Sequence, residues 1–337
     1  MSYIEKINRT LKPAHGTGPL VIDLFAGCGG LALGFEALGF ETHGFEMNAD
    51  CCATYEKNLR GKCSQVLLTK ETPLPKAQVA IGGPPCQPFS VGGHQKGLKD
   101  SRDGFPIFIE AIKKIQPEIF LFENVRGLLY RNKWYLDEII ESLRSLGYIV
   151  EQPVLLNAAY YGVPQKRQRV FVVGHKGKFK LPLPLSHRVS VGEALGEWAR
   201  IAPPESKFLT PNQDAYIAKY EKASSCKNPR DLHLHAPART LTCRNLAGAT
   251  GDMMRIKLPD GRRRRLFVRE AARLQSFPDF FEFQGTETSQ FNQIGNAVPP
   301  LLAYHLAASI RTYLNSDYRF LPVKMESRAR YQQLRLL

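Results

Sequence analysis

The stretch "VIDLFAGCGGLALGFEAL", residues 21–38, combines the signals that decide the fold. Its first residues, 21–25, form a short apolar run that is typical of a buried parallel strand. A glycine-rich turn follows, and residues 30–38 then carry apolar side chains at helical spacing before Gly39, which can end a helix. A strand, a glycine turn and a helix in this order predict the first unit of a doubly wound α/β sheet.

The same turn has the pattern of a nucleotide-binding loop. Gly27 and Gly29 stand between the predicted strand and helix, and Ala32 completes a loose G-x-G-x-x-G/A pattern. Glu46 ends the next predicted strand, about 20 residues further on, where a carboxylate can accept hydrogen bonds from both ribose hydroxyls. The pattern fits NAD, FAD or S-adenosylmethionine, and a glycine turn without a ligand is the structural alternative.

Further apolar segments continue the alternation of strands and helices. The predicted strands lie at residues 41–47, 77–83, 117–125 and 169–175, and the predicted helices at residues 105–116 and 134–148. Residues 1–184 therefore predict an α/β domain with a mostly parallel, doubly wound sheet. The proline-rich stretch "LPLPLSHR" ends this alternation.

The rest of the chain predicts two more parts. Residues 185–290 are rich in Pro, Arg and Asn and show little periodicity, which favours a smaller, irregular, mostly-β second domain with long loops. Residues 291–337 contain an amphipathic helix at 299–314, with Pro at its first positions. We expect this helix to return to the first domain.

Composition restricts the classes of partner. The formal net charge of +15, from 46 Lys and Arg against 31 Asp and Glu, favours a polyanion, with nucleic acid first and a membrane surface second. No apolar run reaches the roughly 20 residues that span a bilayer, and the first residues lack the apolar core of a signal peptide. The seven cysteines form no zinc pattern, so we expect a reduced, cytosolic protein without a bound metal.

Three groups at the ends of predicted strands are candidates for chemistry. Cys86 lies in "IGGPPCQPFS", where prolines restrict the backbone, so it is a candidate nucleophile rather than a packed thiol. Glu123 ends the strand "LFENV", where a partly desolvated acid can hold a proton, although it could also cap a turn. Arg167 and Arg169 precede another strand and share one face, as ligands for a substrate oxygen or as a solvated basic edge.

The ordered motifs resemble the DNA (cytosine-5) methyltransferase family. They are "DLFAGCGG", "FEMN", "GGPPCQPFS", "FENV", "QKRQRVFVVG", "RLFVREAARLQSFPD" and "FNQIGNAVPP". The resemblance runs from about residue 21 to about residue 310 and covers most of the chain. It implies a Rossmann-like, S-adenosylmethionine-dependent methyltransferase fold in which residues 185–290 form the target-recognition domain.

The resemblance also implies residue roles in catalysis. Cys86 matches the nucleophile that attacks carbon 6 of a flipped-out cytosine, and Glu123 matches the residue that protonates ring nitrogen 3. Asn124 matches a residue that holds the cysteine loop. Arg169 matches an arginine near the carbonyl of the base, and Arg167 a supporting arginine.

Further matches concern the cofactor, which the resemblance implies to be S-adenosylmethionine. The matching positions are Phe25, Gly27, Gly29, Glu46, Met47, Pro85, Asn296, Ala297 and Val298. The chain departs from the family in one place: "SQVLLTKETPLP" lacks the usual acidic residue that contacts the adenine amino group. Either a backbone group or Gln65 takes that position, or adenine is held less specifically.

The resemblance implies that double-stranded DNA is the partner. Gln87, Ser90 and Lys96 match the loop that closes over DNA. Thr240, Arg244 and Asn245, in "ARTLTCRN", are our candidates for base contacts, against the alternative of turn residues that touch only phosphate. The run of arginines at residues 262–265 predicts a hairpin tip in contact with phosphate or a solvated charge run, and we favour phosphate.

The leading hypothesis is therefore a sequence-specific DNA methyltransferase of a bacterial restriction–modification system. We expect a cytoplasmic monomer that associates with the nucleoid through DNA and pairs in function with a restriction endonuclease. The alternatives are a tRNA cytosine-5 methyltransferase, a non-catalytic DNA-binding relative and an NAD-dependent oxidoreductase. The last of these would not explain why Cys86 and Glu123 occur together.

Overall fold

The fold is built on one large sheet, as the computed structural model shows for the residues that it describes, 1–85, 103–223, 225, 230–248 and 251–316. Within these residues the sheet has eight strands in the order β3-β2-β1-β4-β5-β9-β6, with β7 also paired to β9. The strands are β1 (Leu20–Leu24), β2 (Glu41–Glu46), β3 (Lys62–Gln65), β4 (Val79–Gly82), β5 (Ile119–Val125), β6 (Ile149–Val150), β7 (Val154–Asn157) and β9 (Gln168–His175).

Strand direction confirms the predicted doubly wound sheet. The pairs β1–β2, β1–β4, β2–β3 and β4–β5 are parallel. Strand β9 runs antiparallel to β5, β6 and β7, so it is the one reversed strand of the described sheet. The parallel strands place their carboxyl ends at one edge, which is where open α/β sheets bind ligands.

Helices cover both faces of the sheet because its central strands are apolar on both sides. Along β5, Ile119 and Leu121 pack on the side of α2 (Gly30–Glu36) and α11 (Pro300–Leu314). Phe120 and Phe122 pack on the side of α4 (Phe105–Ile115) and α5 (Lys133–Ser145). The period-2 alternation of a strand thus fills two separate cores.

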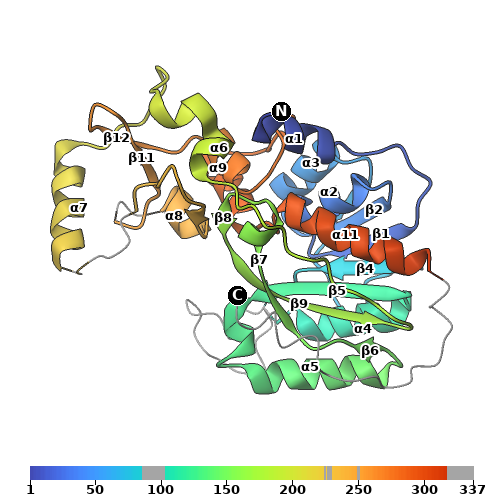
Figure 1. Ribbon diagram of the computed structural model, residues 1–337. Coiled ribbons are helices and arrows are strands. Elements are labelled where there is room, and N and C mark those ends of the chain that lie inside the picture. Colours follow the sequence, from blue (N-terminus) through green and yellow to red (C-terminus); the bar gives the residue numbers. More distant parts are fainter. Residues whose placement is uncertain (86–102, 224, 226–229, 249–250, 317–337) are drawn as a thin grey trace.

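Helix α11 returns to the first part of the fold, as predicted. It lies against α2 at one side of the sheet (Figure 1). A Cβ atom on Gly34 would lie 2.4 Å from the backbone nitrogen of Tyr304, so the two helix backbones approach closely there. Gly34 is not part of the nucleotide-loop pattern, and its role is to let these two helices pack closely.

The prediction that residues 185–290 are mostly β is wrong. This region carries helices α6 (Val191–Leu195), α7 (Pro211–Ala223), α8 (Cys243–Ala247) and α9 (Val268–Leu274). Its described strands β10 (Ala238–Arg239), β11 (Arg255–Lys257) and β12 (Arg263–Arg265) have at most three residues. Figure 1 shows the region to one side of the sheet, with α7 at its far edge.

Helix α7 escaped prediction because apolar burial does not hold it. Ile217 is its one fully buried residue, so the sequence shows no apolar stripe. Asp214 and Glu221 on its inner side instead form ion pairs with Arg263 and Arg255. Such partners, far apart in the sequence, leave no periodic signal.

One apolar core continues across the expected boundary at residue 185. A single cluster contains Cys28 and Leu33 from the first part of the chain together with Leu241, Leu266 and Phe277. Helix α10 (Glu287–Asn296) joins it through Phe291. We therefore propose that residues 1–184, 185–290 and 291–337 differ in function, although they do not form separate hydrophobic cores.

Several elements were not predicted from the sequence: α1 (Tyr3–Thr10), α3 (Ala49–Asn58) and strands β3, β6 and β7. The three strands have two to four residues, too few for a readable alternation. Helix α3 is polar, and its beginning is marked by Asn48, whose side chain accepts a hydrogen bond from the backbone N–H of Cys51 at 3.0 Å. No described helix is both long and apolar enough to cross a bilayer.

Candidate active site

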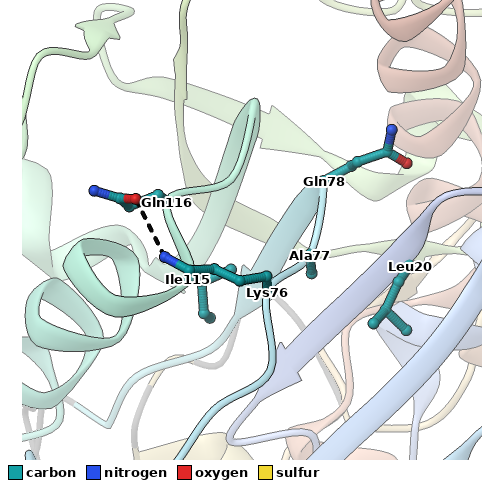
Figure 2. Close-up of a pocket in the computed structure, with 6 residues that line it drawn as sticks. All are labelled: Leu20, Lys76, Ala77, Gln78, Ile115 and Gln116. Atoms are coloured by element: carbon teal, nitrogen blue, oxygen red, sulfur yellow. Dashed lines mark hydrogen bonds between the residues drawn. The ribbon is translucent and has the colours of Figure 1, made fainter.

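The candidate residues gather at the carboxyl edge of the sheet. Phe25 follows β1, Glu46 ends β2, Gly83 follows β4, and Glu123 lies near the end of β5. These strands are parallel neighbours, so their ends lie side by side. A hollow lined by Leu20, Lys76, Gln78 and Gln116 lies at the opposite, amino-terminal edge (Figure 2) and is remote from these residues.

The loop after β1 has a backbone that leaves room for a ligand. Phe25, Gly27 and Gly29 have φ angles of 58°, 55° and 84°, in the left-handed region. A Cβ atom on Gly27 would meet no described atom within 4 Å, whereas one on Gly29 would lie 2.8 Å from the ring of Tyr55. Gly27 therefore faces open space, while Gly29 allows close packing beneath the loop.

Glu46 fixes this loop and keeps acceptor capacity. Its Oε2 accepts a hydrogen bond from the backbone N–H of Gly27 at 3.0 Å, and its Oε1 accepts one from Asn48 at 2.8 Å. A carboxylate has about four acceptor sites, so two remain for ligand hydroxyls. The neighbouring Met47 is 65% exposed, which leaves an apolar side chain available beside the loop.

The segment after α10 packs against the same loop. A Cβ atom on Gly30 would lie 2.6 Å from the carbonyl oxygen of Val298 and 3.2 Å from the Cβ of Ala297. Ala297 and Val298 therefore lie next to the residues predicted to hold the cofactor. Asn296 is exposed, and its Oδ1 accepts a hydrogen bond from the Cys243 thiol at 3.1 Å.

The end of β3 carries no acidic side chain. Gln65 is its last residue, is exposed, and lies opposite Glu46 in the strand register. The backbone N–H of Val66 donates to the carbonyl of Glu46 at 2.8 Å. Gln65 thus stands beside Glu46 at the edge where the family's acidic residue is expected.

Sequence reasoning missed Asp23, an acid in β1 beneath the loop. It is 1% exposed, and its Oδ2 has no hydrogen-bond partner among the described residues. Burial, with a smaller contribution from the charge of Glu46, raises the pKa of Asp23 well above its ordinary value. An aspartate in an apolar strand is a signal for such a group.

Glu123 and Arg169 form a buried pair at the same edge. Val125 lies opposite Arg169 and Glu123 opposite Phe171 across β5 and β9, so the acid and the arginine share one face. Arg169 Nε lies 2.9 Å from Glu123 Oε1. The pairing is one of charge, because this oxygen accepts no aligned hydrogen bond from the described residues.

Burial controls the proton affinity of Glu123. Desolvation raises its pKa above the ordinary value, although the charges of Arg169 and Arg167 act in the opposite direction. An acid with a raised pKa, next to a cation, can hold a proton and transfer it to a substrate. The predicted role of Glu123 as a proton donor stays a prediction.

The residues before Cys86 are held from two sides. Asn124 Nδ2 donates to the carbonyl of Pro84 at 2.9 Å, as expected for a residue that holds the loop. The backbone N–H of Gly104 donates to the carbonyl of Pro85, also at 2.9 Å. A Cβ atom on Gly83 would lie 3.7 Å from Glu123 Oε2, so the chain enters the cysteine loop beside the acid. Cys86, Gln87, Ser90 and Lys96 themselves lie outside the described residues.

Arg167 has different hydrogen-bond partners from Arg169. Its guanidinium donates to the carbonyls of Leu241 at 2.7 Å and Gly295 at 2.9 Å. Arg167 lies between β8 (Gln165–Lys166) and β9, outside the regular alternation of a strand, which explains the different partners. It is therefore held by protein backbone, and its charge also acts to lower the pKa of Glu123.

Of the three candidates for base contacts, Asn245 is wrong. It is 5% exposed, its Oδ1 accepts from the backbone N–H of Thr242, and its Nδ2 donates to the carbonyl of Thr240. It caps α8 and cannot reach a ligand. The hydroxyl of Thr240 donates to the carbonyl of Lys166 at 2.7 Å, whereas Arg244 is exposed and forms an ion pair with Asp252.

The favoured reading of residues 262–265 as phosphate contacts is wrong for Arg264 and is not supported for Arg263. Arg264 is fully buried and forms a bidentate pair with Glu270, and Arg263 pairs with Asp231 and Asp214. Arg262 pairs with Asp260 and stacks on Phe208. A run of like charges cannot reveal acidic partners that are distant in sequence.

One exposed segment beside Glu123 was missed. Strand β5 leads into a short helix, Arg126–Leu129, and then Tyr130, which is 62% exposed. The guanidinium of Arg126 lies 5.6 Å from the centre of the Tyr130 ring, and its Nη1 donates to Gln168 Oε1 at 3.0 Å. Basic residues interleaved with aromatic ones, in "VRGLLYRNKW", were the signal for this surface.

Comparisons with known proteins point to one family. A family model described as "C-5 cytosine-specific DNA methylase" matches residues 20–193 and 212–312. The chain is 55% identical to the Type II methyltransferase M.AplI of Arthrospira platensis, over 94% of this chain and 93% of that protein. It is 36% identical to the Type II methyltransferase M1.HphI of Haemophilus parahaemolyticus, over 86% of each.

Solved structures share the fold. The S. pombe Dnmt2 methyltransferase superposes with a TM-score of 0.68 at 16% identity, over 89% of this chain and all of that one. This likeness concerns architecture alone.

Proposed function

The chain belongs to the C-5 cytosine-specific DNA methylase family and is a DNA (cytosine-5) methyltransferase; from this premise we propose how its residues carry out the reaction. The observation that carries the proposal is the placement of the Glu123–Arg169 pair beside Gly83, Pro84 and Pro85. An acid, a cation and the entry to the cysteine loop meet at the edge that also holds the Glu46 loop.

We propose that the Cys86 thiolate attacks carbon 6 of the target cytosine. Carbon 5 is a poor nucleophile, and addition of sulfur at carbon 6 makes the ring an enamine. As the carbon–sulfur bond forms, the Glu123 carboxyl donates its proton to ring nitrogen 3, which removes the negative charge. Carbon 5 then takes the methyl group, its proton leaves to a base, and sulfur departs as the thiolate. Ring nitrogen 3 returns its proton to the Glu123 carboxylate, which restores the neutral aromatic ring and the acid.

Arg169 serves two purposes in this scheme. Its guanidinium lies against Glu123 and is 15% exposed, so part of it can face a base in the site. There it would donate to the carbonyl oxygen of cytosine. Its positive charge also favours the carboxylate that Glu123 becomes after it has given up the proton.

The residues at the loop after β1 fit S-adenosylmethionine, the cofactor of the family. Glu46 has free acceptor capacity for the two ribose hydroxyls, and Gly27 faces open space. Met47 offers an apolar surface to adenine, and Gln65 stands where its amide can bond the exocyclic amine. Phe25, Gly29, Pro85, Asn296, Ala297 and Val298 complete the proposed site. The bound cofactor supplies the methyl group.

DNA is proposed to lie between the recognition region and the carboxyl edge. The target base must leave the duplex to reach Cys86 and Glu123. Arg244, Thr240 and the Arg126–Tyr130 surface are the described candidates for DNA contact, and Gln87, Ser90 and Lys96 remain candidates from the sequence. Which base pairs they read is decided by loop contacts in the recognition region.

The relatives suggest a cellular setting. They are named Type II methyltransferases, and we propose that this chain protects host DNA against a restriction endonuclease with which it pairs in function. We propose that this chain acts as a monomer in the bacterial cytoplasm, bound to the nucleoid through DNA. Its net charge of +15 supports a polyanionic partner.

The proposal is tested by expression in a host without cytosine methylation, followed by bisulfite sequencing of its DNA. We expect one protected cytosine within a single short sequence. Purified protein with labelled S-adenosylmethionine is then offered duplex DNA and tRNA in parallel. Label on tRNA alone would overturn the DNA assignment.

A further inference from the structure

Arg167 joins segments that lie far apart in the sequence. It is 1% exposed, and Nη1 and Nη2 donate to the carbonyls of Leu241 and Gly295. Among the described residues no carboxylate lies within ion-pair distance of its guanidinium, although Arg169 does pair with an acid. A buried cation without a carboxylate is costly, so the bonds to these two carbonyls are needed to offset its desolvation.

The Leu241 side of this junction belongs to the recognition region. The backbone N–H of Leu241 donates to Gln165 Oε1 at 2.8 Å, so both backbone groups of Leu241 bond to residues 165–167. Strand β10 also pairs in parallel with β8, with Ala238 opposite Gln165. The segment 238–241 is therefore held to residues 165–167 by strand pairing and by hydrogen bonds of Leu241.

The Gly295 side belongs to the proposed cofactor site. Gln275 Nε2 donates to the carbonyls of Ile294 at 2.9 Å and Ala297 at 2.8 Å, and Gln275 Oε1 accepts from Gln165. A Cβ atom on Gly295 would lie 2.5 Å from the backbone nitrogen of Cys243, so the two segments touch. Ala297 and Val298 then pack on Gly30 at the start of α2.

We propose that Arg167 is a positioning residue that couples DNA binding in the recognition region to cofactor binding at the loop after β1. This inference rests on the proposed function. DNA that orders residues 238–245 holds Leu241, and the guanidinium transmits that order to Gly295 and to the segment against Gly30. By linkage, the cofactor tightens DNA binding by the same factor. Lysine cannot replace Arg167 here, because its single charged nitrogen does not match two carbonyls on separate segments, as Nη1 and Nη2 of the guanidinium do.

The test measures how much DNA tightens the binding of S-adenosylhomocysteine, the unreactive product. Titration calorimetry is done with the wild type and Arg167→Lys, with and without a duplex that carries the site mapped by bisulfite sequencing. We expect wild-type affinity to rise with DNA by a factor in the range of about 5 to 150. In Arg167→Lys the factor falls toward one, while the affinity without DNA changes little. In turnover, the variant raises the KM for S-adenosylmethionine more than it lowers kcat.

Arg264→Lys is the matched control. Arg264 is equally buried, but its partners are Glu270 and the carbonyls of Trp198, Ile201 and Arg265, away from residues 294–298. We expect it to lower stability and to leave the coupling factor unchanged. Loss of coupling in both variants would assign the effect to general destabilisation and overturn the proposal.

Other outcomes are equally decisive. A wild-type factor of one, or an unchanged factor in folded Arg167→Lys, overturns the coupling role. If Arg167→Lys does not fold, Gln165→Met removes the hydrogen bonds of Gln165 to Leu241 and Gln275 at the same junction without altering a proposed DNA contact, and an unchanged factor there overturns the coupling role instead. Wild-type protein that binds DNA but methylates no cytosine would refute the proposed function and not the coupling.

Discussion

Glu123 and Asn124, adjacent residues at the end of β5, have different partners: Glu123 pairs with Arg169, and Asn124 bonds the Pro84 carbonyl. Successive residues of β5 point to opposite faces. Glu123 therefore meets Arg169 on one face, and Asn124 reaches the Pro84 carbonyl on the other. Glu123 and Asn124 are adjacent in sequence, and the strand directs their side chains to opposite faces, so Glu123 lies near Gly83 while Asn124 bonds Pro84.

The buried acid has a measurable effect on stability. Burial raises the pKa of Glu123, so the folded chain binds this proton more tightly than the unfolded chain. The stability that it contributes is fully present below the ordinary pKa of glutamic acid and is lost as pH rises through the raised pKa. We expect the Tm of the wild type to fall relative to that of Glu123→Gln across this window.

Thermal unfolding of both proteins from about pH 4 to pH 8 checks this, since that range begins near the ordinary pKa of glutamic acid. The difference between the two proteins removes the contribution of other titrating groups. A difference that stays constant, or that favours the wild type as pH rises, contradicts burial as the dominant influence on Glu123.

Much of the site was predictable from residues at strand ends, but not all of it. Glu123, Arg169 and Glu46 could be placed because strand ends and their faces follow from the apolar pattern. Arg167 and Asn245 could not, because their partners are backbone groups: distant ones for Arg167, and those of its own turn for Asn245. Which polar atoms meet inside a fold is decided by tertiary packing, and the sequence carries no period for it.

At the scale of elements, the contact between α2 and α11 shows how the chain end is fixed. Gly34 lets the two backbones approach, and a methyl group there would lie 2.4 Å from the nitrogen of Tyr304 and 2.5 Å from the carbonyl carbon of Ala303. Backbone atoms cannot move aside as a flexible side chain can. The helix that carries the glycine loop at its start is thus positioned by the last helix of the fold.

We expect Gly34→Ala to destabilise the protein by about 1–3 kcal/mol, the usual cost of overpacking. Gly127→Ala is the matched control, because a Cβ atom there meets nothing described within 4 Å, and its effect should stay within about 0.5 kcal/mol. Urea unfolding of the three proteins measures both values. Equal midpoints for the two variants would contradict the close approach of α2 and α11.

The helices and strands that were predicted from the sequence differ from the others in the interactions that stabilise them. Strands β1, β2, β4, β5 and β9 and helices α2, α4, α5 and α11 were predicted, because each buries an apolar face that leaves a period in the sequence. Helix α7 was not, because ion pairs with Arg255 and Arg263 hold it, whereas the β11–β12 hairpin agrees with the hairpin predicted at residues 262–265. The recognition region was therefore misread as mostly β.

Two features belong to the whole molecule: an apolar core shared between distant parts of the chain and an excess of positive charge. The apolar cluster that contains Cys28 and Leu241 joins residues 185–290 to the loop after β1 in one core. The net charge of +15 remains after many arginines are used internally, as with Arg263 and Arg264. Arg244 and Arg126 are exposed and are the residues that we propose for contact with phosphate.

DNA affinity should therefore depend steeply on salt. Neutralised phosphates release counterions, so a protein with six to ten phosphate contacts loses about 10³–10⁵ in affinity between 50 and 200 mM salt. We expect a loss of at least about 10³ here by fluorescence anisotropy with the mapped duplex. S-adenosylhomocysteine binding is the control and should change little. A flat response for DNA would contradict electrostatic attachment.

The central claim is that Cys86, entering from the Pro84–Pro85 segment beside Glu123, attacks the target base. A duplex with 5-fluorocytosine at the target position tests it most directly, because fluorine at carbon 5 cannot leave as a proton does and the sulfur adduct persists. With S-adenosylmethionine, the wild type should form a DNA complex that survives denaturing electrophoresis, and Cys86→Ser should form none. A stable adduct with Cys86→Ser, or no adduct with an active wild type, would contradict the account.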